Sequence, residues 1–154
     1  MKQIIDLLAE HPFFAGLEPD QIELIAGCGT NVHFAPGGAI LTEGAPADTF
    51  YVVRRGSVAL EIAAPHRDPV VVETLGAGEV VGMSWLLPPY RWTFDGRART
   101  DVSAIELDAA CLRGKCDDDP VLGYALYTRF AGLMRERLQA TRLQLLDLYG
   151  SHAG

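Results

Sequence analysis

The chain has 154 residues, 49% of them hydrophobic and 21% charged, and its 13 basic and 20 acidic side chains give a formal net charge of -7. This composition is typical of one compact globular domain, residues 1–154, and excludes an intrinsically disordered chain. No basic run is present, so we expect no direct DNA binding. No apolar stretch is long enough to span a membrane, and Asp6 and Glu10 interrupt the N-terminal segment where a signal peptide needs an apolar core. We therefore expect no membrane association and a cytoplasmic location.

Residues 1–29 predict two short helices. "IIDLLAE" has apolar residues at helical spacing and stops before Pro12. The second helix begins near Glu18, has Pro19 in its first turn and ends at Gly27.

Residues 30–108 consist of short β-rich runs separated by Gly and Pro. A strand, a turn at Pro36 to Gly38 and another strand come first. "TFYVVRRGSVALEIA" then predicts a hairpin about "RRGS", and "DPVVVETLGAGEVVG" predicts two further strands. A last strand ends at Asp108. Strands at this spacing, flanked by helices, predict a mainly β protein with a double-stranded β-helix, or jelly roll.

Residues 109–118 are predicted as a hinge, and residues 119–149 as a long helix. Asp119 is the expected N-cap, Pro120 occupies the first helical position and Gly150 follows the last turn. A helix of about 30 residues spans ~45 Å, which is longer than a small β-domain is wide.

The long helix carries two apolar stripes. One adjoins the other along the helix and consists of Leu126, Phe130 and Leu133. The other follows heptad spacing and consists of Met134, Leu138, Thr141, Leu145 and Leu148. We expect this second stripe, the helix seam, to pair two copies as a homodimer; the alternative is that both stripes pack on the β-domain.

The three cysteines form no dense framework, which fits a reducing compartment. Cys111 and Cys116 lie beside the basic Arg113 and Lys115, so a redox switch at the hinge is one hypothesis; two ordinary thiols are the favoured interpretation. The four histidines show no metal-like spacing, and no catalytic motif is recognisable. We therefore expect no metal, no resident cofactor and no enzymatic activity.

Three segments together resemble a known family. "ILTEGAPADTFYVVRRGSVALEI", "LGAGEVVG" and "RARTDVSAIELD" are similar, in this order, to the glycine turn, the cassette entry and the exit strand of the cyclic nucleotide-binding domain. The resemblance covers about residues 10 to 148 and points to the sensor half of the catabolite-activator and fumarate-nitrate-regulator superfamily.

In that family, a short helix and one Arg hold the cyclic phosphate, and a Glu accepts a hydrogen bond from the ribose. The resemblance places Gly82 at the cassette glycine and Thr93 at its Ser/Thr, but Met83 at the Glu and Trp92 at the Arg; Arg91 lies one residue away. Two missing hydrogen bonds to charged partners remove ~3–6 kcal/mol, or roughly 10²- to 10⁴-fold in affinity. We expect no tight binding of cyclic AMP.

The candidate ligand-binding residues are Gly82, Met83, Ser84, Trp85, Arg91, Trp92, Thr93 and Arg97. The aromatic side chains here and the nearby arginines can bind a flat anionic or apolar effector. The favoured interpretation is instead that Trp85, Trp92 and Phe94 fill the cavity of a nucleotide.

These observations predict a stand-alone, dimeric sensor module without a helix-turn-helix domain, acting through contacts with a protein partner. One alternative is a true receptor that grips a cyclic nucleotide through a bulged Arg91. Another is a transcriptional regulator that recruits a separate DNA-binding subunit.

Overall fold

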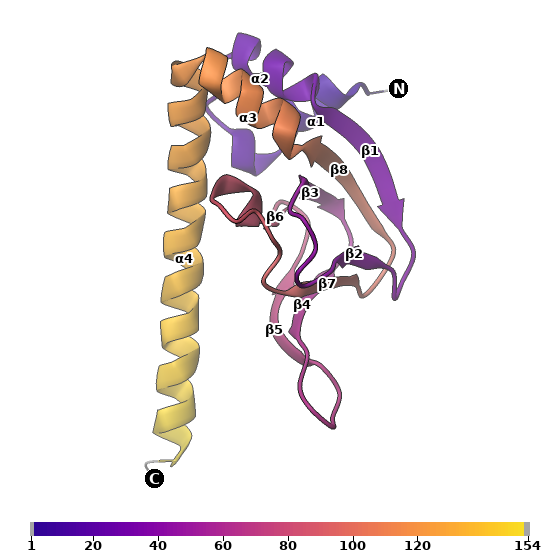
Figure 1. Ribbon diagram of the computed structural model, residues 1–154, viewed down its shortest axis with the longest axis vertical. Coiled ribbons are helices and arrows are strands. Elements are labelled where there is room, and N and C mark those ends of the chain that lie inside the picture. Colours follow the sequence, from indigo (N-terminus) through magenta and orange to yellow (C-terminus); the bar gives the residue numbers. More distant parts are fainter. Residues whose placement is uncertain (1, 153–154) are drawn as a thin grey trace.

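The computed structural model describes residues 2–152, and side chains are described up to residue 150. Two antiparallel four-stranded sheets form a β-roll beside a long helix (Figure 1). In sheet order, the first contains β1 (Gly29–Phe34), β8 (Val102–Asp108), β3 (Thr49–Arg55) and β6 (Val80–Val81); the second contains β2 (Ala39–Leu41), β7 (Asp95–Ala98), β4 (Val58–Ile62) and β5 (Val70–Leu75). The predicted jelly roll with flanking helices is confirmed.

The predicted hairpin between β3 and β4 is wrong. β3 pairs with β6 and β8, whereas β4 pairs with β5 and β7 in the other sheet. Gly56 between them has a φ of +97°, and a Cβ atom there would lie 2.2 Å from the carbonyl oxygen of Asp101. This close approach permits only glycine, and the turn carries the chain from one sheet to the other.

The N-terminal helices follow the sequence prediction closely. They are α1 (Ile4–Glu10), the short 3₁₀ helix η1 (Pro12–Phe14) and α2 (Pro19–Ala26). Glu18 caps α2 in a capping box with Gln21, so the predicted start is confirmed. η1 was not predicted, and it places the Phe13 ring 4.8 Å from the ring of Phe130 on the long helix.

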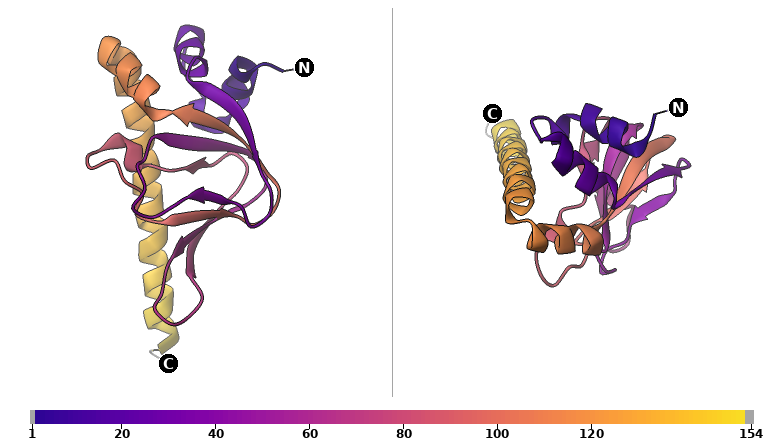
Figure 2. Two further views of the ribbon diagram at one scale, coloured as in Figure 1. Left: turned by 45° about the vertical axis from the view of Figure 1, so that its right-hand side comes forward. Right: turned by 90° about the horizontal axis from the view of Figure 1, so that it is seen from above.

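The predicted hinge residues form helix α3 (Ala109–Asp118), and α4 (Pro120–His152) follows directly. The Asp119 carboxylate accepts a hydrogen bond from the Leu122 amide at 3.2 Å, which confirms the predicted cap. The prediction that α4 ends before Gly150 is wrong, because Gly150 lies inside the helix. A single glycine costs a helix only about 1 kcal/mol, so the helix continues through it. α4 stands along one side of the β-roll, and its last turns extend in the same direction as the loop between β4 and β5 (Figures 1 and 2). None of the helices within residues 2–152 is both long and apolar enough to cross a bilayer.

A disulfide joins Cys28 to Cys111, so the interpretation of Cys111 and Cys116 as two ordinary thiols is wrong. The sheet explains the pairing, because Gly29 at the start of β1 lies opposite Leu107 near the end of β8. Cys28 and Cys111 flank these positions although they are 83 residues apart in sequence. Cys116 is a buried thiol, and burial raises its pKa, as do the neighbouring carboxylates of Asp117 and Asp119, which makes it a poor nucleophile.

Candidate functional site

A cavity of about 470 Å³ lies between the β-roll and α4. Six of the eight predicted ligand-site residues line it: Gly82, Met83, Ser84, Arg91, Trp92 and Thr93. From α4 come Met134, Arg137, Leu138 and Thr141. The aromatic side chains therefore do not fill this space, and its volume is in the range of pockets that bury small organic ligands.

The floor of the cavity depends on the pair Gly82 and Trp92. Gly82 has a φ of +105°, and a Cβ atom on it would lie 2.6 Å from Cη2 of the Trp92 ring. Both observations demand glycine, since other residues rarely adopt this backbone conformation and the indole leaves no space. The Trp92 ring, itself buried, thus covers the backbone at Gly82.

Met83 follows this glycine and precedes the short 3₁₀ helix η2 (Ser84–Leu86). Its side chain is half-buried and packs against the hydrophobic core. Met83 is the N-cap residue of η2, but its side chain forms no capping hydrogen bond with that helix. A thioether is a weak hydrogen-bond acceptor, so Met83 presents an apolar wall.

The Arg91 side chain lies at the mouth of the cavity. Its Nη1 donates to the carbonyl oxygen of Gly44 at 2.8 Å, and its backbone forms an isolated bridge with Pro46. This guanidinium is therefore anchored to the loop after β2.

Two predicted ligand-site residues, Trp85 and Arg97, do not line the cavity. Trp85 is fully buried, stacks on Phe50 at 4.7 Å and meets the Phe130 ring edge-on at 5.3 Å. Arg97 points outward from β7, where Nη1 donates to the Gly37 carbonyl oxygen at 3.1 Å and Nε lies 3.7 Å from Glu61. The alternation of side chains along a strand and the burial of a large aromatic ring account for both placements.

Arg137 and Glu73 are lining residues that sequence reasoning missed. The Arg137 side chain is only 14% exposed, its Nε lies 3.6 Å from Oε1 of Glu73, and it donates to the carbonyl oxygen of Val80. Burial lowers the pKa of Arg137, and the surrounding carboxylates oppose this effect. No local pattern marks these residues, because each contact joins positions more than 50 residues apart in sequence.

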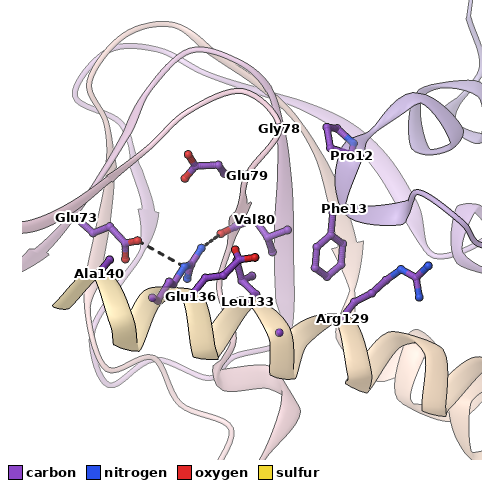
Figure 3. A pocket seen from close by; sticks show the side chains of 12 residues that line it. Pro12, Phe13, Glu73, Gly78, Glu79, Val80, Arg129, Leu133, Glu136 and Ala140 are labelled. Atoms are coloured by element: carbon purple, nitrogen blue, oxygen red, sulfur yellow. Dashed lines mark hydrogen bonds and ion pairs between the residues drawn. The ribbon is translucent and has the colours of Figure 1, made fainter. Parts of the chain in front are cut away.

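Arg137 also lines a second cavity, of about 540 Å³, and Glu73 lines both cavities as well. Figure 3 shows this cavity, with Pro12 and Phe13 at one end, Glu79 opposite α4, and the ion pair and hydrogen bond of Arg137 as dashed lines. Three carboxylates and two guanidinium groups line it: Glu73, Glu79, Glu136, Arg129 and Arg137. Within residues 2–152, no cluster of His, Cys, Asp and Glu has the arrangement to hold a metal ion.

The two stripes of α4 have different surroundings. Leu126 and Phe130 are fully buried against the β-roll and Leu133 is partly buried. The helix seam is exposed: Met134, Leu138 and Thr141 border the cavity, and Leu145 and Leu148 lie beyond it. The alternative in which both stripes pack on the β-domain is therefore wrong.

The loop that carries Trp85 and Tyr90 is tied to α3 by one residue. Arg113 donates from Nη1 to the Trp85 carbonyl oxygen at 2.7 Å, and its guanidinium lies over the Tyr90 ring at 4.4 Å. Movement of this loop is thus mechanically connected to the helix that leads into α4.

Comparisons with known proteins bear on the fold and the family of this chain. A family profile described as the cyclic nucleotide-binding domain matches residues 31–119. The chain is 27% identical over 143 residues to the CRP-like cAMP-activated global transcriptional regulator of Mycobacterium tuberculosis, covering 93% of this chain and 62% of that protein. It thus spans about three fifths of this curated relative.

Two solved structures share the fold. A Geobacter metallireducens protein assigned to the cyclic nucleotide-binding proteins matches with a TM-score of 0.79 and 28% identity, covering 90% of this chain and 99% of that one. The N-terminal domain of a Streptomyces coelicolor transcriptional regulator matches with a TM-score of 0.70 and 29% identity, covering 88% of this chain and 94% of that one.

Proposed function

The chain belongs to the cyclic nucleotide-binding domain family, and we propose that it is a regulatory, non-catalytic sensor module that does not bind cyclic AMP tightly and signals through α4 to a protein partner. The observation that carries this proposal is the Trp92 ring, which lies on Gly82 with Met83 beside it.

The resemblance assigns an arginine and a glutamate to the positions of Trp92 and Met83. Neither side chain here can pair with a phosphate or accept a hydrogen bond from a ribose hydroxyl in their place. Arg91, the nearest guanidinium in the sequence, is hydrogen-bonded to the Gly44 carbonyl instead. The loss of ~3–6 kcal/mol turns a micromolar site into one weaker than about 0.1 mM.

The signal would travel from the cavity to α4 along two routes. One is the Arg113 contact between the cavity loop and α3, and the other is the α4 wall of the cavity itself. An occupant that favours one pose of α4 shifts the population toward that pose. The exposed seam on the same helix would pair two copies of the chain, so the change of pose would be read out by the dimer and its partner.

Isothermal titration calorimetry with cyclic AMP and cyclic GMP tests the proposal. We expect no binding tighter than about 0.1 mM for the natural chain. The double variant Met83→Glu with Trp92→Arg supplies both missing groups and gains affinity, whereas Met83→Gln with Trp92→Gln, which supplies neither charge, does not. A low-micromolar dissociation constant for the natural chain would refute the proposal.

A second candidate is a regulator of transcription that works with a separate DNA-binding subunit. The Mycobacterium tuberculosis and Streptomyces coelicolor relatives, both transcriptional regulators by name, favour it. Affinity purification of the tagged chain from a native extract, followed by identification of the retained proteins, tests it: recovery of a DNA-binding protein in stoichiometric amount supports this candidate, and its absence argues against it.

A further inference from the structure

The two cavities that meet at Arg137 differ in charge. The cavity of Figure 3 has three carboxylates against two guanidinium groups, so it repels an anion. The cavity beside Trp92 has two guanidinium groups, Arg91 and Arg137, against the single carboxylate of Glu73. In a chain with a formal net charge of -7, the cavity beside Trp92 is a local site of positive charge.

Arg137 has hydrogen-bonding capacity to spare. A guanidinium carries five N–H donors. Within the described structure the guanidinium of Arg137 makes one hydrogen bond, to the Val80 carbonyl oxygen, and the ion pair with Glu73, while the carboxylates of Glu79 and Glu136 act on it electrostatically. The ion pair spans 3.6 Å from Nε to Oε1, beyond ordinary hydrogen-bond distance. A largely buried charge is stabilised by further charge-assisted hydrogen bonds, and a planar carboxylate fits the guanidinium geometry.

The remaining wall of this cavity is largely apolar. Leu41 and Leu60 line it from the two strands β2 and β4, Trp92 from the cassette loop, and Met134 and Leu138 from α4. Such a wall suits a hydrocarbon or aromatic body and offers few hydrogen-bond partners for a polyhydroxylated sugar.

We infer that the cavity beside Trp92 binds a small organic carboxylate with an apolar body, and that Arg137 on α4, rather than a residue of the cassette, holds the carboxylate. This inference rests on the proposed function, because it requires a cavity that a cyclic nucleotide does not occupy. The carboxylate competes with Glu73 for Arg137, so binding weakens the link between α4 and β5. The ligand thereby acts on the helix that carries the seam.

Binding of 4-phenylbutyrate and of its neutral match, 4-phenylbutyramide, tests the inference by calorimetry and by tryptophan fluorescence, since Trp92 lines the cavity. We expect the carboxylate to bind at least about tenfold more tightly than the amide, as one charge-assisted hydrogen bond contributes ~1.5–3 kcal/mol. Arg137→Gln removes this preference and Arg137→Lys retains part of it. Arg142→Gln, an exposed arginine on α4 outside the cavity, leaves it unchanged.

Circular dichroism and thermal melting establish that each variant is folded. Equal affinity for acid and amide, an unchanged preference in folded Arg137→Gln, or no saturable binding of either probe overturns the inference. The proposed function fails on a different result, tight binding of cyclic AMP to the natural chain. Loss of probe binding without cyclic AMP binding therefore rejects the carboxylate site alone.

Discussion

The two halves of α4 have the same secondary structure but different sources of stability. In the first half, Leu122, Leu126 and Phe130 are fully buried against the β-roll and the N-terminal helices. In the second half, Leu143, Leu145 and Leu146 are between 47% and 66% exposed. Most helical stability in proteins comes from tertiary packing of an apolar face, so the exposed half depends on its continuity with the packed half and on whatever covers its leucines.

On the proposed function, this difference separates folding from signalling within one helix. The first half belongs to the core of the domain, and its substitution affects the free energy of unfolding. The second half contributes little to that core, and on the proposed pairing of two copies its substitution affects association. The cavity beside Trp92 lies at the transition, since Met134, Arg137 and Leu138 border it. A ligand bound there, as we propose, would contact α4 where its buried half meets its exposed half.

Phe130→Ala gives the largest expected effect. The Phe130 ring contacts the rings of Phe13, Phe50 and Trp85 at 4.8 to 5.3 Å, and its removal leaves a cavity in the core. We expect the free energy of unfolding to fall by about 3–5 kcal/mol in urea titration. Leu143→Ala, on the exposed half, changes it by less than about 0.5 kcal/mol. Similar losses for the two variants would show that the two halves do not differ in this way.

The double variant Leu138→Glu with Leu145→Glu tests whether the second half of α4 pairs two copies of the chain. Each leucine buried in a seam contributes ~1.5–3 kcal/mol, so the dissociation constant of the dimer should rise at least about a hundredfold. Sedimentation equilibrium over a range of protein concentrations measures it. Gln139→Glu with Gln144→Glu adds the same charge at exposed positions off the seam and should leave the dimer intact. A monomeric natural chain, or equal effects of both pairs, contradicts the prediction.

Local chemistry made the helix starts and most strands predictable. Glu18 and Pro19 set the start of α2, and Asp119 and Pro120 set the start of α4, because caps act within three or four residues. The family resemblance, carried by three segments in order, gave the fold, and six of the eight candidate ligand-binding residues line the cavity beside Trp92.

Long-range pairing was not predictable in the same way. Adjacent strands β3 and β4 have a hairpin pattern, yet each pairs in a different sheet, and only the three-dimensional path shows it. The Cys28–Cys111 disulfide follows from the register of β1 against β8, which no spacing encodes. Arg137 is one arginine among several on an amphipathic helix until β5 brings Glu73 beside it.

His11 supports the packed half of α4 through η1. Its Nδ1 accepts a hydrogen bond from the Phe13 amide at 3.2 Å, so the proton is on Nε2, which lies 3.1 Å from the Val53 carbonyl oxygen and donates to it. This arrangement fixes η1, and η1 holds the Phe13 ring against Phe130. Protonation of Nδ1 would remove the acceptor that the Phe13 amide uses.

The smallest effect we expect is therefore a dependence of stability on pH. Burial lowers the pKa of His11 below its usual value of 6.5, with the hydrogen bond to Val53 opposing, so the unfolded chain binds the proton more readily than the folded one. The stabilisation from neutral His11 is complete above about pH 6.5 and is lost as the pH falls below it toward the lower folded pKa. Urea midpoints between pH 7.5 and 5.5 should decline more steeply for the natural chain than for His11→Asn, which keeps a side-chain acceptor for Phe13 but does not titrate. The control variant His33→Asn changes an exposed histidine that lies 3.5 Å from Asp101. Its urea midpoint should fall with pH almost as steeply as that of the natural chain. If His11→Asn and the natural chain decline in parallel, the buried imidazole is not the group that links pH to the packing of Phe13 on α4.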